Sequence, residues 1–195
     1  MTSLPITPSA HAIAAPSPWV RRWSRLLSPG CTVLDVACGS GRHLHWFATR
    51  GHAVWGVDQD ITMASQQVPQ ARLIQADIEN GPWPFMGTDG PQHFRAVVVT
   101  NYLWRPLMPT LVRSVAPGGF LIYETFAAGN ETVGRPARPD FLLQPGELLR
   151  VCAGMQVIAY EDGFVAEPDR FVQRIVAFAP ALPTAPTAEK PRHAL

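Results

Sequence analysis

Apolar residues recur along the chain in short runs that alternate with segments of helical or loop character. Five of these runs are predicted strands, and the fourth is an unbroken apolar run of the kind buried on both faces of a parallel sheet. They span residues 33–36, 53–57, 72–78, 96–100 and 120–125. The alternation of such strands with crossover segments predicts an α/β protein.

Further elements flank these five strands. Ser17-Pro18 precedes apolar residues at helical spacing, which predicts a leading helix whose Trp19 and Trp23 pack in the core. Two more strands are expected to form a C-terminal hairpin, so that the sheet has seven strands and the last one is antiparallel. The expected positions are 155–160 and 171–178 for these strands and 161–169 for the turn between them.

Glycine and proline mark where regular structure should be absent. Residues 79–94 contain six of them, which predicts a crossover made mostly of loop. The Pro-Gly-Gly sequence at 117–119 predicts a turn before the fifth strand. The proline-rich ends, residues 1–16 and 180–195, offer little apolar surface to bury, so we expect two disordered tails around one domain, residues 17–179.

The strand at 33–36 runs into a glycine-rich turn, Ala37 to Gly41, and then into a predicted helix. A strand, glycine turn and helix in this order commonly receive a nucleotide-like ligand. The second strand ends at Asp58, about twenty residues further on, where a carboxylate can accept both hydroxyls of a ribose. The third strand is also followed by an acid, Asp77.

The spacing of the glycines distinguishes a dinucleotide site from a site for another nucleotide-like ligand. A dinucleotide site needs a third small residue in its G-x-G-x-x-G/A pattern, and this chain has Leu44 there. Asp35, just before the turn, suits a cationic ligand. The three strand-acid units together resemble the class I S-adenosylmethionine-dependent methyltransferases over roughly residues 17–179. Two residues depart from that pattern: Ala37 replaces a glycine, which a negative φ would tolerate, and Arg95 replaces an aspartate before the fourth strand.

The resemblance implies a Rossmann-like, seven-stranded, mostly parallel sheet with helices on both faces, and S-adenosylmethionine as cofactor. It also implies roles for individual residues. Asp35 would orient the loop and the ligand's amino end, Gly39 and Gly41 would let the backbone approach the methionine part, Asp58 would bind the ribose, Asp77 and the Ile78 backbone would bind adenine, and Asn101 would meet the cofactor. Each acid has the alternative of capping a loop or helix.

The acceptor side is expected beside the fourth and fifth strands. Asn101 and Tyr102 stand where the resembled family meets donor and acceptor, and the glycine-rich segment 126–143 leaves the carboxyl end of the fifth strand. Glu124, Glu131 and Arg135 are the only charged groups that we expect there. Arg135 either binds an anionic substrate or closes the loop with a salt bridge. The candidate catalytic residues are Asn101, Tyr102, Glu131 and Arg135.

A looser similarity to tellurite-resistance and thiopurine-type methyltransferases favours a small-molecule methyl acceptor. Two alternatives stay open: a non-catalytic protein that binds S-adenosylmethionine or S-adenosylhomocysteine, and a methyltransferase acting on RNA or protein. The net charge of +1 and the pI near 7.8 make nucleic acid an unlikely partner. The sequence does not indicate an oligomeric state.

Cysteine and histidine do not indicate a metal site. The three cysteines, Cys31, Cys38 and Cys152, form no C-x-x-C pair, and His43 and His45 face different ways on a helix. No apolar run approaches the ~20 residues of a membrane span. We therefore expect no metal, no membrane partner and a cytoplasmic protein.

Overall fold

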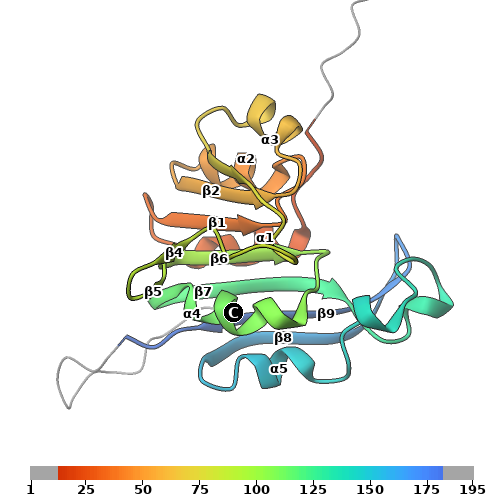
Figure 1. Ribbon diagram of the computed structural model, residues 1–195. Coiled ribbons are helices and arrows are strands. Elements are labelled where there is room, and N and C mark those ends of the chain that lie inside the picture. The colour runs from red at the N-terminus through yellow and green to blue at the C-terminus, as the bar shows by residue number, and fades with distance from the viewer. Residues whose placement is uncertain (1–12, 182–195) are drawn as a thin grey trace, which may run out of the picture.

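The computed structural model describes residues 13–181, which form one seven-stranded sheet in the order β3-β2-β1-β6-β7-β9-β8 (Figure 1). The predicted tails, 1–16 and 180–195, lie mostly outside the described residues and stay predictions. The strands of the sheet are β1 (Thr32–Val36), β2 (Ala53–Asp58), β3 (Arg72–Gln75), β6 (Phe94–Thr100), β7 (Val115–Phe126), β8 (Gln156–Val165) and β9 (Arg170–Phe178).

The direction of the strands confirms the predicted topology. The pairs β1–β2, β2–β3, β1–β6 and β6–β7 are parallel, whereas β9 runs antiparallel to both β7 and β8. The chain builds β1, β2 and β3 outward in one direction and then crosses to β6 on the other side of β1. In open α/β sheets a ligand crevice lies at this point, outside the carboxyl ends of the strands.

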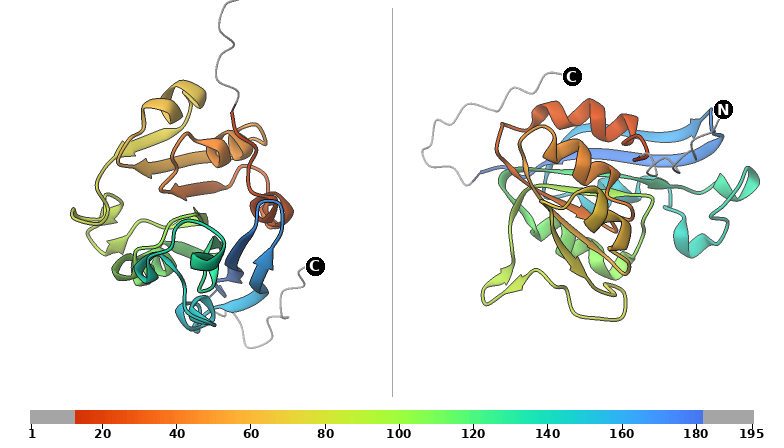
Figure 2. Two further views of the ribbon diagram at one scale, coloured as in Figure 1. Left: turned by 90° about the vertical axis from the view of Figure 1, so that its right-hand side faces the viewer. Right: turned by 90° about the horizontal axis from the view of Figure 1, so that it is seen from above.

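Helices cover both faces of the sheet, as Figure 2 shows. On one face, Trp23, Phe47 and Ala64 come from three helices and pack into one hydrophobic cluster; on the other, Leu111 and Leu148 belong to a second cluster. The helices are α1 (Pro18–Trp23), α2 (Arg42–Ala48), α3 (Thr62–Gln67), α4 (Met108–Arg113) and α5 (Glu147–Val151), with 3-10 turns η1 (Ser24–Leu26), η2 (Arg105–Leu107), η3 (Asn130–Thr132) and η4 (Pro139–Phe141). None of the helices in residues 13–181 is long and apolar enough to cross a membrane.

The crossover between β3 and β6 contains no helix, which confirms the loop predicted from its glycines and prolines. Its regular structure is a two-residue hairpin of β4 (Met86–Gly87) and β5 (Gly90–Pro91). Trp83 and Phe85 are buried there and cover the sheet where a helix would otherwise lie. Phe85 contacts Trp55 and Phe94 edge to face, at ring-centroid distances of 6.1 and 5.4 Å.

One turn predicted from the sequence is wrong, and another is shorter than expected. Residues 117–119 belong to β7, where the pairing with β6 shifts register between Phe94 and Ala96; Gly118 has a φ of 76° in this bulge. The turn expected at 161–169 is confirmed at 166–169, whereas residues 161–165 extend β8 because they pair with β9. The buried tryptophans of α1, Trp19 and Trp23, are core residues as expected.

Candidate functional site

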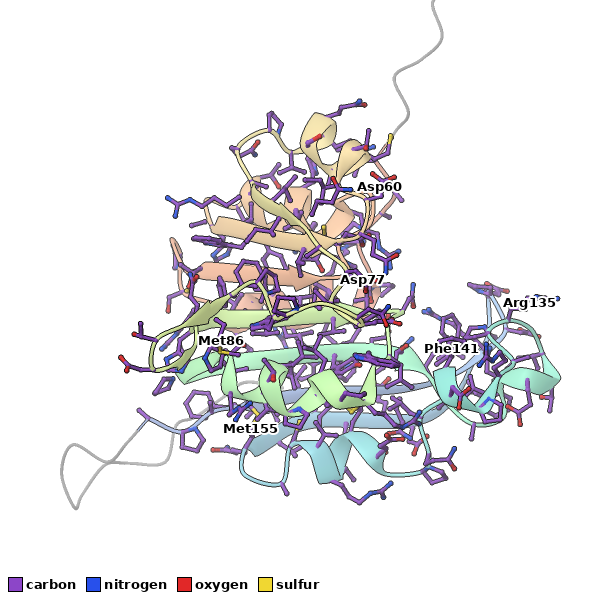
Figure 3. All side chains as sticks on the ribbon, viewed as in Figure 1. Asp60, Asp77, Met86, Arg135, Phe141 and Met155 are labelled. Atoms are coloured by element: carbon purple, nitrogen blue, oxygen red, sulfur yellow. The ribbon has the colours of Figure 1, made fainter. Side chains whose placement is uncertain are left out.

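The predicted cofactor residues gather at the carboxyl ends of β1, β2, β3 and β6. Figure 3 shows Asp60 and Asp77 at this edge of the sheet. The glycine turn after β1 is held there by hydrogen bonds: the Cys38 amide donates to the Val57 carbonyl at 3.1 Å, and the Gly41 amide donates to the Cys38 carbonyl at 2.9 Å. The turn is therefore fixed to β2.

Asp58 joins the end of β2 to the glycine turn. Its Oδ2 accepts a hydrogen bond from the Gly39 amide at 2.8 Å, and its Oδ1 accepts one from the Asp60 amide at 3.1 Å. Each oxygen keeps a second lone pair for a ligand. Gly39 has a φ of 52°, and the space where a side chain would stand is open, so that a ligand can approach the backbone.

Ala37 differs from the sequence-based expectation. The replacement of glycine by alanine is harmless at negative φ, but Ala37 has a φ of 53°. An L-residue pays roughly 1–2 kcal/mol for this left-handed conformation. Ala37 also lines the cavity described below, so the strained residue lies at the site itself.

Asp35, the second-to-last residue of β1, is buried with 1% of its surface exposed, and neither carboxyl oxygen has a hydrogen-bond partner among the described residues. Burial raises the pKa of Asp35 to about 8, with a smaller contribution from Asp58 and an opposing one from Arg42. His43 Nδ1 lies 3.8 Å from its Oδ2. A buried carboxyl without a partner suits a cationic ligand group.

His43 links Asp35 to the start of α1. Its Nε2 accepts a hydrogen bond from the Ser17 amide at 3.1 Å, so that Nδ1 carries the proton and faces Asp35. Burial, and to a smaller extent the charge of Arg42, lower the pKa of His43 to about 3. The histidine is therefore a neutral hydrogen-bonding group at ordinary pH.

Glu124, which we expected on the acceptor side, is instead part of the buried polar interior. Its side chain is 1% exposed; Oε1 accepts a hydrogen bond from the Ser17 hydroxyl at 2.8 Å, and Oε2 pairs with Arg174 Nε at 2.6 Å. The expectation is wrong because β9 lies directly beside β7 and supplies the arginine opposite Glu124 in the antiparallel register.

Asp77 holds the loop that follows β3. Its Oδ1 accepts hydrogen bonds from the amides of Glu79 and Asn80, at 3.0 and 3.1 Å, and its Oδ2 accepts one from Asn80 Nδ2 at 3.0 Å. These bonds, that to the Asn80 side chain above all, lower the pKa of Asp77. Asp77 therefore caps the loop after β3, which is the alternative to adenine binding that its position also allows. Gly81 closes the loop, since a Cβ there would meet the Asp77 carbonyl at 2.7 Å.

A cavity of about 230 Å³ lies between these loops. Asp58 and Ile78, which the resemblance assigns to the ribose and the adenine, line it together with Tyr102, a candidate catalytic residue. Sequence reasoning missed Gln59 and Glu79, although each directly follows a predicted residue. The complete lining is Ala37, Asp58, Gln59, Ile78, Glu79 and Tyr102.

A second cavity, of about 310 Å³, adjoins the first, because Glu79 and Tyr102 line both. We call it the acceptor cavity. Asn101 borders it in a left-handed conformation, with a φ of 53°. Its lining comprises Glu79, Asn101, Tyr102, Leu103, Thr125, Phe126, Pro136 and Phe141. The segment predicted to cover the acceptor side therefore contributes Phe126, Pro136 and Phe141.

Glu131 and Arg135 lie apart from the acceptor cavity. They line a separate hollow of about 590 Å³, and Figure 3 shows Arg135 at the outer end of its loop, beyond Phe141. Glu131 Oε2 accepts a hydrogen bond from the Gly129 amide at 2.8 Å. Arg135 makes no ion pair with any residue between 13 and 181, so the loop-closing salt bridge is not formed in the structure.

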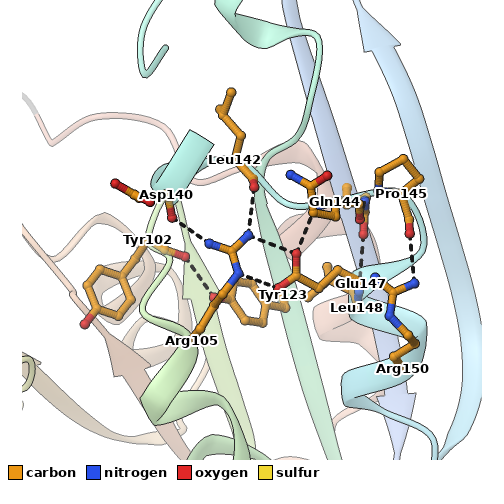
Figure 4. Close-up of polar contacts among 11 residues, drawn as sticks. Tyr102, Arg105, Tyr123, Asp140, Leu142, Gln144, Pro145, Glu147, Leu148 and Arg150 are labelled. Carbon is orange, nitrogen blue, oxygen red and sulfur yellow. Dashed lines mark hydrogen bonds and ion pairs between the residues drawn. The ribbon is translucent and has the colours of Figure 1, made fainter. Parts of the chain in front are cut away.

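Arg105 holds the chain on both sides of Phe141, which lines the acceptor cavity, through the polar contacts drawn in Figure 4. It binds Glu147 through Nε and Nη2, at 2.7 and 3.0 Å, and donates to the carbonyls of Asp140 and Leu142, at 2.8 and 2.9 Å. Residues 139–147 are thereby tied to η2. On the inner side, the Tyr123 hydroxyl donates to the Tyr102 carbonyl at 2.9 Å. The sequence contained no signal for this cluster.

Comparisons with known proteins agree with the fold. Residues 33–119, somewhat less than half of the chain, match the sequence family described as "Methyltransferase domain". A comparison with curated proteins gives no match.

Solved structures at low identity share the architecture. A TehB-like S-adenosylmethionine-dependent methyltransferase from Corynebacterium glutamicum aligns at 21% identity and a TM-score of 0.60, covering 82% of this chain and 85% of that chain. TehB from Haemophilus influenzae aligns at 17% identity and a TM-score of 0.63, covering 82% and 60%. The [4+2]-cyclase SpnF aligns at 15% identity and a TM-score of 0.59, covering 84% and 78%.

The match to a methyltransferase domain and the fold shared with S-adenosylmethionine-dependent methyltransferases, TehB among them, both support the resemblance predicted from the motifs. S-adenosylmethionine is the cofactor of this class. The site fits that group on three observations: the buried, unpartnered carboxyl of Asp35, the open backbone at Gly39, and the carboxylate of Asp58 beside the first cavity.

Proposed function

We propose that the chain transfers a methyl group to a small-molecule acceptor bound in the acceptor cavity. The observation that carries this proposal is the junction of the two cavities at Glu79 and Tyr102. A donor in one cavity and an acceptor in the other would meet there. Positioning of this kind supplies up to roughly 7–11 kcal/mol of acceleration in intramolecular reactions.

The residues that would hold the cofactor are those predicted from the sequence. Asp35 would receive the ammonium, Gly39 and Gly41 would let the backbone approach the methionine part, and Asp58 would accept from the ribose hydroxyls. Asp77, the Ile78 backbone and Asn101 would complete the set, Asp77 mainly by holding the loop. When bound, the cofactor supplies a methyl group on a sulfonium, which is a good leaving group.

Tyr102 would align the two ligands. Its side chain is half-buried between the cavities, and its hydroxyl oxygen is buried without a hydrogen-bond partner among residues 13–181. Burial raises the pKa of Tyr102, and the nearby carboxylate of Glu79 raises it further. The phenol therefore stays protonated at neutral pH and is a hydrogen-bond donor toward the junction.

The size of the acceptor cavity, about 310 Å³, supports a small molecule over a macromolecule. The near-neutral net charge of +1 also argues against a nucleic-acid acceptor. A cytoplasmic location stays a prediction.

Tritiated methyl transfer tests the proposal. The protein is incubated with labelled S-adenosylmethionine and with separate small-metabolite, RNA and protein fractions. Label in the small-metabolite fraction alone is the expected result. Label in RNA or protein would refute the small-molecule acceptor, and tight cofactor binding without transfer to any fraction would favour a non-methylating role; the likeness to a cyclase shows that this fold also serves other chemistry.

A further inference from the structure

Glu79 lies where three hollows of the site meet. It lines the cofactor-side cavity, the acceptor cavity and a third hollow beside η2, and among the residues lining these three only Glu79 is common to all. Its backbone is held by the Asp77 turn, since its amide donates to Asp77 Oδ1 at 3.0 Å. Its carboxylate forms no ion pair with any described residue. A carboxylate on an anchored backbone, without an ion pair among the described residues, thus lies at the junction.

The rest of the acceptor cavity is uncharged. Apart from Glu79, its lining carries three aromatic rings, those of Tyr102, Phe126 and Phe141, and the polar side chains of Asn101 and Thr125. No lysine or arginine contributes to the lining. One carboxylate among aromatic rings favours a cation, because the ring faces and the carboxylate both attract positive charge.

The two arginines of the neighbouring hollow are already paired with carboxylates. Arg105, in the neighbouring hollow, binds Glu147 at 2.7 Å, and Arg138 pairs with Asp140 at 2.9 Å. Arg135, the residue suggested by the sequence for an anionic substrate, lines the separate hollow of the outer loop. The acceptor cavity therefore has no free positive group with which to bind a carboxylate or phosphate.

We propose that the acceptor is a small organic amine, whose protonated nitrogen is bound by Glu79 and whose apolar body packs against Tyr102, Phe126 and Phe141. This inference rests on the proposed function and names its substrate class. Glu79 is the specificity-determining residue: it selects a cationic acceptor and disfavours an anionic one.

Binding of three matched probes to the protein saturated with S-adenosylhomocysteine tests this inference without requiring turnover. The probes are 2-phenylethylamine, the neutral 2-phenylethanol and the anionic phenylacetate, which share an aromatic body and differ in charge. We expect the amine to bind about tenfold more tightly than either of the others, as for one favourable charge contact of about 1.4 kcal/mol. Glu79→Gln, measured with the protein again saturated with S-adenosylhomocysteine, should abolish this preference.

Asp89→Asn is the matched control, because it removes the same charge from an exposed position in the same crossover, outside the three hollows. It should keep the preference for the amine. Equal binding of the three probes, no binding of any of them, or tighter binding of phenylacetate would overturn the inference. A preference for the amine that survives in Glu79→Gln, with weakened S-adenosylhomocysteine binding, would also overturn it by making Glu79 a cofactor ligand. Failure of S-adenosylhomocysteine itself to bind the unaltered protein would instead refute the proposed function.

Discussion

Replacing Asp35 by asparagine should change how the stability of the protein depends on pH. The folded protein holds the Asp35 proton up to a pKa of about 8, whereas the unfolded chain releases it near 3.8. Between these values the folded state binds more protons, so the free energy of unfolding falls as pH rises, by about 1.4 kcal/mol per pH unit. From about pH 5 to about pH 7 this contribution amounts to about 3 kcal/mol.

His43 opposes this trend over part of the range. Its folded pKa is about 3 and its ordinary value 6.5, so it makes the protein more stable as pH rises toward 6.5. The two buried groups therefore offset each other in the unaltered protein below that pH, and the difference between the protein and Asp35→Asn isolates Asp35. The Tm of the unaltered protein, taken relative to that of Asp35→Asn, should therefore fall by roughly 6–12 °C between about pH 5 and about pH 7.

Urea unfolding followed by tryptophan fluorescence over a pH series measures this difference. Asp60→Asn is the control, because Asp60 is exposed and its hydrogen bonds to Thr62 lower its pKa, so that its contribution has the opposite sign. If the difference curve for Asp35→Asn is flat across this range, Asp35 is ionised in the folded protein and our assignment of a neutral, buried carboxyl is wrong.

Three other substitutions have distinct expected outcomes. Asp58→Ala should weaken binding of S-adenosylhomocysteine by roughly 1–3 kcal/mol in calorimetry, since two ribose hydroxyls lose a charged acceptor; normal binding by a protein with a collapsed Tm would make Asp58 purely structural. Ala37→Gly should raise the free energy of unfolding by up to about 1 kcal/mol by relieving the left-handed residue, net of the entropy of glycine, and a clear loss of stability would contradict this. Arg174→Met should cost roughly 3–5 kcal/mol because it leaves Glu124 buried and unpaired; the double variant with Glu124→Gln should recover part of that loss, and no recovery would argue against the pair.

The number and direction of the strands could be predicted from the sequence, because apolar runs and turns are local signals. The run at 96–100 is apolar on both faces, which is typical of a strand in a covered parallel sheet, and the run at 33–36 is interrupted only by Asp35. The β7 bulge at Pro117 could not be predicted in this way, because it depends on the register with β6, a strand that contacts it only in the folded chain. The extra length of β8 likewise depends on its pairing with β9.

The gathering of the candidate cofactor residues at one edge of the sheet was predictable for a similar reason. Asp35 and Asp58 lie at or next to the ends of β1 and β2, Gly39 lies in the turn after β1, and parallel strands bring their carboxyl ends to one edge of the sheet. The hydrogen bonds of Ser17 to His43 and to Glu124 join residues 26 and 107 positions apart, and no local sequence pattern predicts them.

The acceptor side was the least predictable part. The sequence suggested Glu131 and Arg135 because they are charged residues of a glycine-rich loop. In the structure these two residues line a separate hollow. The Arg105–Glu147 ion pair instead holds the chain that follows their loop beside the acceptor cavity. Glu79 was overlooked because it stands in the loop after Asp77, where the sequence alone does not show which cavity its side chain borders.

Calorimetry with S-adenosylmethionine, S-adenosylhomocysteine and NAD tests the central claim most directly. We predict that the first two bind with one site per chain, that Asp58→Ala weakens both, and that NAD does not bind, because Leu44 stands where a dinucleotide site needs a small residue. Tight binding of NAD together with no binding of S-adenosylmethionine or S-adenosylhomocysteine would contradict the account.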